Sequence, residues 1–280
     1  MAEIVTYRRV ADFLDRAEAW LLRKEAENNL ILGVASRIAS EVSDKSEYLF
    51  LTVEENGNVV GCAFRTPPWK LVVTECPAQS IEGLVDLVQQ RYPDLAAVLG
   101  PNPTARSFAA AWARRYELTF RPGMRQRVYE LDTVVKPDPA AEGTSRVADE
   151  KEKTLLVEWL VAFHHEVGFP LDDPEGSAAR LLEEGEAWFW CNPEPVSLAV
   201  CTGHTRNGVR IGLVFTPVEQ RGHGYASEIT AALAQNALDR GKQTCFLFTD
   251  VDNPTSNKIY RSIGFRPVTD MIDYLFEPQR

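Results

Sequence analysis

A strand that breaks into a glycine turn and then a helix is the sequence feature that most restricts this fold. Residues 209–215 are mainly apolar and β-branched, and Pro217 prevents the strand from continuing. Residues 227–240 carry apolar side chains at helical spacing. The sequence therefore predicts a strand that passes directly into a helix N-terminus through a turn containing Gly222 and Gly224.

This turn has the properties of a phosphate site. The first turn of a helix leaves backbone N–H groups without internal partners and carries the positive end of the helix dipole, so it attracts anions. Gly222 and Gly224 let the backbone approach a ligand closely. A tight turn without a ligand is the alternative, and the two glycines alone do not distinguish it from an anion site.

A dinucleotide-binding fold is the nearest competitor, because its glycine fingerprint also follows a strand and opens a helix. That fold places the fingerprint in the first unit of a long alternation of strands and helices. Here only residues 225–280 follow the turn, and Ser227 stands where the third glycine or alanine is expected. The position in the chain therefore argues against a dinucleotide site.

Two ordered blocks carry a resemblance to a known family. Residues 220–226, Gln-Arg-Gly-His-Gly-Tyr-Ala, resemble the acyl-CoA pyrophosphate loop (Gln/Arg-x-x-Gly-x-Gly/Ala) of the GNAT N-acetyltransferase superfamily. Residues 246–265 resemble its later strand, Asn-containing turn and helix, which end in a Tyr-x-x-x-Gly-Phe signature that begins here at Tyr260. The resemblance covers about the second half of the chain, and Val218 departs from it where a second proline is expected.

The resemblance implies an enzyme that transfers an acetyl group from acetyl-CoA to a primary amine, without a metal. The amine belongs to a small molecule or a peptide and attacks the thioester directly in a ternary complex. Main-chain groups of the strand would pair with the pantetheine amides, and loop N–H groups would take the pyrophosphate. The coenzyme A contacts implied in this way are Leu213, Val214, Phe215, Gln220, Arg221, Gly222, His223, Gly224, Tyr225, Ala226, Asn253, Ser256 and Tyr260.

Tyr260 is also the predicted catalytic acid, since a tyrosine at this place in many GNAT enzymes donates a proton to the leaving sulfur. The ordinary pKa values, about 10 for tyrosine and about 8.5 for a thiol, make that transfer mildly uphill. Packing of the aromatic ring is the alternative. Asn253 and Ser256 are equally well explained by helix capping.

Glu166 is the predicted catalytic base, because the attacking amine must lose a proton. It follows His164 and His165 at the end of a predicted helix, in the region that borders the acceptor pocket in the resembling fold. A solvated helix end explains these residues without any catalytic role. Glu219 and Asp250 also lie near the inferred cleft.

Charge and cysteine content restrict the partners and the compartment. A net charge of −10 argues against a nucleic acid or an anionic membrane surface as a partner. The five scattered cysteines include no Cys-x-x-Cys pair, so neither a disulfide framework nor a zinc site is expected. The sequence contains no apolar segment typical of a leader or of a membrane span, so we expect neither export nor membrane insertion and expect a cytoplasmic location.

A run of prolines and small residues at 136–144 predicts a linker between two domains. We expect a degenerate GNAT-like domain at 1–135 and a catalytic GNAT domain at 145–280. The predicted fold class is α/β, with each domain a mixed, mostly antiparallel sheet flanked by helices. In the second domain, strands are predicted near 145–148, 187–191, 196–202, 209–215, 243–249 and 271–276, and helices near 150–167, 177–184, 227–240 and 255–263.

Three short segments of the first half recur in the same order in the second, which favours a duplication. They are Asn-Pro-Thr at 102–104 and 253–255, Phe-Arg-Pro at 120–122 and 265–267, and the similar strands 61–66 and 197–202. Residues 68–77 of the first half contain no glycine, so no anion site is expected there. An acyl-CoA sensor without turnover and an interaction protein of two inactive copies are the alternative functions.

Overall fold

The computed structural model describes residues 2–41 and 45–279, which form two halves of similar element order. The first half consists of β1 (Glu3–Tyr7), α1 (Val10–Leu21), η1 (Leu22–Lys24), α2 (Glu25–Ser40), β2 (Leu49–Glu55), β3 (Asn58–Arg65), β4 (Leu71–Val73), η2 (Ala78–Ser80), α3 (Ile81–Arg91), β5 (Ala97–Pro101), α4 (Asn102–Tyr116) and β6 (Leu118–Leu131). The second half consists of β7 (Thr144–Val147), η3 (Glu150–Glu152), α5 (Lys153–Val167), α6 (Pro174–Glu183), β8 (Ala187–Cys191), β9 (Pro195–Thr202), β10 (Gly208–Phe215), η4 (Val218–Gln220), α7 (Tyr225–Asp239), β11 (Thr244–Asp250), α8 (Pro254–Ser262) and β12 (Arg266–Pro278).

All these strands belong to one 12-stranded sheet with the order β1-β2-β3-β4-β5-β12-β6-β11-β10-β9-β8-β7. The pairs β4–β5 and β10–β11 are parallel, and the other neighbours are antiparallel. The predicted mixed, mostly antiparallel α/β class is confirmed.

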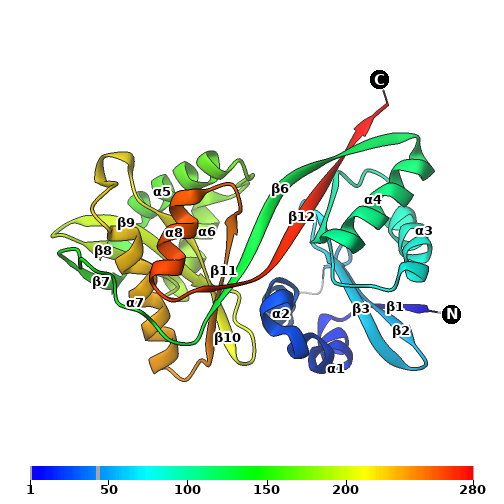
Figure 1. Ribbon diagram of the computed structural model, residues 1–280, viewed down its shortest axis with the longest axis horizontal. Helices are drawn as coiled ribbons and strands as arrows, with labels where there is room; N and C mark the ends of the chain where they lie inside the picture. Colours follow the sequence, from blue (N-terminus) through cyan, green and yellow to red (C-terminus); the bar gives the residue numbers. More distant parts are fainter. Residues whose placement is uncertain (1, 42–44, 280) are drawn as a thin grey trace.

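The last strand of each half lies in the other half's part of the sheet. β12 pairs with β5, and β6 pairs with β11, while β6 and β12 pair with each other along most of their length. Figure 1 shows these two long strands side by side between the helices of the two halves. At their centre Arg127 and Asp270 form two hydrogen bonds of 2.7 and 2.8 Å, and this pairing lowers the pKa of the Asp270 carboxyl.

The final strand is longer than its sequence indicates. Alternation predicts a strand near 271–276, whereas β12 extends over Arg266–Pro278. The extension arises because β12 has a strand on each side, so both backbone edges are hydrogen-bonded. The sequence does not indicate the full length of β12 because it contains Asp270 and Asp273, and acidic residues are uncommon inside central strands.

Each half has two hydrophobic cores, one on either face of the sheet, and the exchanged strands complete one core in each half. Tyr274 of β12 is buried in the first-half core beneath α3 and α4. Tyr129 and Leu131 of β6 are buried in the second-half core beneath α7 and α8. Each half therefore buries apolar side chains that the other half supplies.

The recurring sequence segments occupy matching places in the two halves. The segment 102–104 opens α4 directly after β5, and 253–255 opens α8 after β11. The strands 61–66 and 197–202 correspond to β3 and β9, each of which precedes a parallel-paired strand. The predicted helices and strands of the second half are all present, with boundaries shifted by a few residues.

Candidate active site

The parallel strands β10 and β11 separate after their first few residues. They pair only from Gly208–Thr244 to Arg210–Phe246, although both strands continue. The edge of β10 beyond this point faces β11 without a ladder to it. An extended ligand with amide groups fits such an opening, because it can form main-chain hydrogen bonds as an added strand would.

An irregularity in β10 contributes to this separation. The register with β9 shifts between Gly212 and Phe215, and Leu213 has a positive φ of 50°. Leu213 and Phe215 pack towards α5, whereas Val214 packs towards α7. The carbonyl of Phe215 accepts a hydrogen bond of 3.0 Å from the Ser197 hydroxyl. Among the described strand pairs, Leu213 and Val214 have no register partner in β9 or β11.

The loop after β10 presents a set of backbone donors. Gly222 and Gly224 both have a φ of +84°, and Gly224 is the N-cap of α7. Within the described part of the chain, the N–H groups of residues 222–226 form no internal hydrogen bonds. Gln220 precedes them in η4, and Tyr225 and Ala226 form the first turn of α7. These N–H groups and the positive helix end suit a phosphate.

Side chains hold this loop in place. The guanidinium of Arg221 donates to the carbonyl of Thr216 at 2.9 Å and forms an ion pair of 2.7 Å with Glu166. The imidazole of His223 contacts the carbonyl of Gln220 at 3.2 Å and stacks on the ring of Tyr225. The loop is therefore braced before any ligand binds.

This arrangement bears directly on the predicted catalytic base. Glu166 lies at the end of α5, and its carboxylate is engaged by the guanidinium of the loop. Its neighbour His164 has a buried Nδ1 without a hydrogen-bond partner, and burial lowers the pKa of this imidazole. A base role for Glu166 stays a prediction.

The first turn of α8 faces the end of β11. The Asn253 side chain accepts from the backbone N–H of Ser256 at 3.0 Å, so it caps the helix as the alternative interpretation expected. The buried Asn257 amide donates to the carbonyls of Asp250 and Asn253 at 2.8 and 2.7 Å. These bonds join the helix to the strand end.

Tyr260 lies one turn further along α8 and is buried. Its ring contacts those of Tyr129 and Phe265. Burial raises the pKa of Tyr260 to about 12. The free-energy cost of transferring a proton from this phenol to a thiolate, whose thiol has an ordinary pKa of about 8.5, is therefore larger than the ordinary pKa values indicate.

Comparisons with known proteins agree with this geometry. Residues 194–272, from β9 into β12, match a family described as FR47-like protein. An acetyltransferase from the GNAT family of Colwellia psychrerythraea is 16% identical with a TM-score of 0.57, covering 98% of this chain and 99% of that chain. A GCN5-related N-acetyltransferase from Sphaerobacter thermophilus is 17% identical with a TM-score of 0.64, covering 97% and 94%. A tandem GNAT protein from the clavulanic acid biosynthesis pathway is 12% identical with a TM-score of 0.54, covering 100% and 99%.

The chain has the tandem GNAT fold. The resemblance to the GNAT superfamily that residues 220–226 and 246–265 indicated is confirmed at the level of the fold. No curated protein matches the sequence significantly.

Only the second half of the tandem GNAT fold presents the glycine loop. In the corresponding segment of the first half, the N–H of Thr74 donates to the carbonyl of Cys62 and that of Cys76 to the Thr104 hydroxyl. Pro77 in that segment has no N–H to offer. These bonds occupy N–H groups of that segment, and the expectation that the first half is a degenerate copy stays a prediction.

Sequence reasoning missed the contribution of β6 to the neighbourhood of α8. Tyr129, from the first half, lies against Tyr260 and donates a hydrogen bond to Asn257. A local pattern cannot reveal this, because strand exchange places residues beside each other that are more than a hundred positions apart in sequence. A signal in the sequence is that Tyr129 and Tyr274 follow the two Phe-Arg-Pro segments at equal spacing.

Two further observations concern metals and membranes. Across residues 2–41 and 45–279, no three His, Cys, Asp or Glu side chains are arranged to hold a metal ion. None of the helices in these same ranges is both long and apolar enough to cross a membrane.

Proposed function

We propose that this chain is an N-acyltransferase that transfers an acetyl group from acetyl-CoA to a primary amine. The observation that carries the proposal is the row of free N–H groups at residues 222–226, at the end of a strand that has separated from its parallel neighbour. These donors fit a pyrophosphate, and the open edge of β10 fits the amides of pantetheine. The second half, residues 145–280, supplies this site.

Acetyl-CoA brings the thioester that the amine attacks. A nitrogen–carbon bond forms while the carbon–sulfur bond breaks, so the amine must lose a proton and the departing sulfur must gain one. We assign proton donation to Tyr260, which burial keeps protonated throughout the neutral range. Glu166 is the proposed acceptor of the amine proton, and its contact with Arg221 also steadies the loop.

A thiol-release assay with acetyl-CoA tests the proposal. The acceptors are small amines, amino acids, polyamines, aminoglycosides and peptide N-termini, since the acceptor is a small-molecule or peptide amine. Acceptor-dependent release of coenzyme A thiol is the expected result. Tight acetyl-CoA binding without release for any acceptor contradicts turnover and favours a sensor, whereas absence of binding in calorimetry contradicts the site itself.

A further inference from the structure

Tyr129 crosses from the first half of the chain into the neighbourhood of the proposed site. It belongs to β6, which lies beside β11 of the second half. Its side chain is fully buried, and its ring centroid is 6.5 Å from that of Tyr260. The first half thus supplies a side chain that contacts the proposed proton donor directly.

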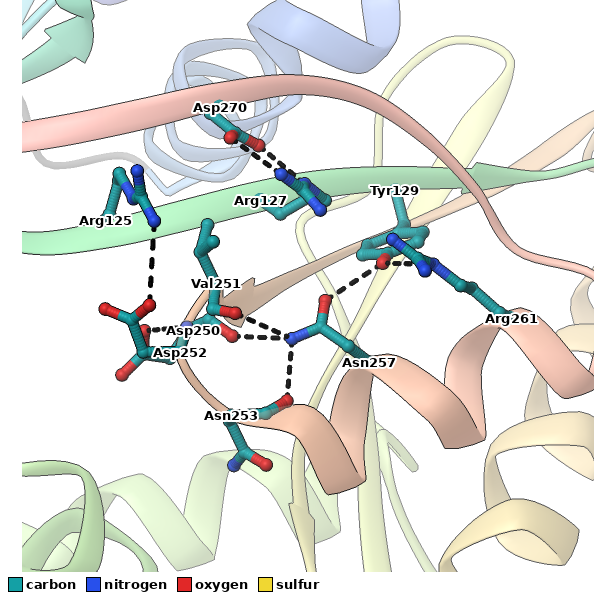
Figure 2. A network of polar contacts seen from close by, with 10 residues as sticks. All are labelled: Arg125, Arg127, Tyr129, Asp250, Val251, Asp252, Asn253, Asn257, Arg261 and Asp270. Atoms are coloured by element: carbon teal, nitrogen blue, oxygen red, sulfur yellow. Dashed lines mark hydrogen bonds and ion pairs between the residues drawn. The ribbon is translucent and has the colours of Figure 1, made fainter.

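A chain of hydrogen bonds runs through the Tyr129 hydroxyl, as Figure 2 shows. The Nε of Arg261 donates to the phenol oxygen at 3.2 Å, and the phenol donates to Oδ1 of Asn257 at 2.9 Å. The Asn257 Nδ2 then donates to the carbonyls of Asn253 and Asp250. A rotated amide would place its oxygen against those carbonyls, so the carbonyls set the orientation of Asn257 and leave its Oδ1 facing the Tyr129 hydroxyl.

This orientation holds a helix that has little stability of its own. α8 spans only Pro254–Ser262, and so short a helix depends on contacts outside itself. Asn257 connects the first turn of α8 to the end of β11, and Tyr260 follows one turn later on the same helix. The bond from Tyr129 thus completes the hydrogen bonds of the amide that joins α8 to β11, three residues before Tyr260.

The first half contains a related bond, whose acceptor Asn102 aligns with Asn253 and not with Asn257. Tyr274 of β12 donates to Oδ1 of Asn102 at 2.6 Å, at the start of α4. Tyr129 and Tyr274 each follow the repeated Phe-Arg-Pro segment by the same distance in sequence. When the Asn-Pro-Thr segments that open the two helices are aligned, Ala109 stands in α4 where α8 has Tyr260. In each half, a tyrosine hydroxyl thus donates to an asparagine of the helix. That helix carries the phenol of Tyr260 in the second half and Ala109 at the aligned place in the first half.

We infer that Tyr129 is a positioning residue that the first half contributes to the proposed site, acting through Asn257 and α8 on Tyr260. The inference rests on the proposed acetyl transfer. It also gives the degenerate copy a function: its last strand completes the sheet beside β11 and orients the proton donor.

The test uses Tyr129→Phe, which keeps the ring and removes the hydroxyl, with Tyr274→Phe as the matched control. Losing one buried hydrogen bond that orients the acid should lower kcat about fivefold, with KM for acetyl-CoA unchanged. Tyr274→Phe should leave both constants unchanged while lowering stability to a similar extent. In a Tyr260→Phe background, Tyr129→Phe should cause no further loss of kcat, because the group that it positions is gone.

Hydrogen exchange of residues 254–262 gives a readout that does not depend on turnover. Exchange there should quicken in Tyr129→Phe but not in Tyr274→Phe. Arg261→Gln, on the exposed side of the network, should produce a smaller change in the same direction and serves if Tyr129→Phe does not fold. An unchanged kcat, an equal loss with Tyr274→Phe, or an additive loss in the double variant overturns the inference. If the parent protein turns over no acceptor, the proposed function fails, and the exchange experiment then decides separately whether Tyr129 holds α8.

Discussion

The loop glycines offer the most direct test of the phosphate site. A Cβ added to Gly222 would have no heavy atom within 4 Å, so Gly222→Ala meets no clash in the free protein. The cost comes from the φ of +84°, which an L-residue occupies at a penalty of about 1–2 kcal/mol. We expect Gly222→Ala to fold with stability reduced by that amount.

The effect on binding should be larger than the effect on folding. A loop that relaxes from its positive φ turns its N–H groups away from the ligand. Each hydrogen bond to a charged group contributes about 1.5–3 kcal/mol, so losing one should weaken acetyl-CoA binding about ten- to a hundredfold. Isothermal titration calorimetry with acetyl-CoA measures this change, and urea unfolding measures the stability.

Gly241→Ala is the matched control. Gly241 also has a positive φ, of 91°, and open space around its position, but it lies beyond the far end of α7. The 15-residue helix between the two glycines is about 22 Å long. Gly241→Ala should lose similar stability and keep its affinity. Equal acetyl-CoA affinity in the two variants would refute the assignment of residues 222–226 to the pyrophosphate.

Three other outcomes are expected. Tyr260→Phe should lower kcat on a good acceptor while acetyl-CoA affinity is retained. In the parent protein, the pKa of Tyr260 is about 12 in the folded state and about 10 in the unfolded state. The parent should therefore lose stability between about pH 10 and pH 12, and the variant should lose less. Glu166→Gln and Arg221→Gln should each raise KM for acetyl-CoA. Their coupling free energy in a double-mutant cycle should be below about 1 kcal/mol, because the ion pair is half-exposed. Only Glu166→Gln should also lower kcat, and an unchanged kcat in that variant would exclude Glu166 as the base. Leu131 belongs to β6 of the first half and is buried in the second-half core, so Leu131→Ala should lower the free energy of unfolding by about 2–5 kcal/mol. Circular dichroism and tryptophan fluorescence should still report one coincident urea transition. Separate transitions would mean that the halves unfold independently.

The sequence by itself determined the local elements of the second half and the likeness of its two motif blocks to GNAT enzymes. Strand β10, the glycine turn and α7 were predictable because alternation, proline and glycine act on neighbouring residues. The duplication was also visible, because paired segments recur in order. The longer extent of β12 was not, since acidic residues interrupt its pattern while two neighbouring strands stabilise it.

Only the tertiary structure decided how the two halves share their last strands. β6 and β12 have no local signal for exchange, because the partner of a strand is set by packing and hydrogen bonding between distant segments. The strand exchange brings Tyr129 to Asn257, and the fold brings Glu166 to Arg221. Both hydrogen bonds join residues far apart in sequence, so both form only when the whole chain has folded. The burial that raises the pKa of Tyr260 has the same origin, since a residue's solvation depends on what the whole fold places around it.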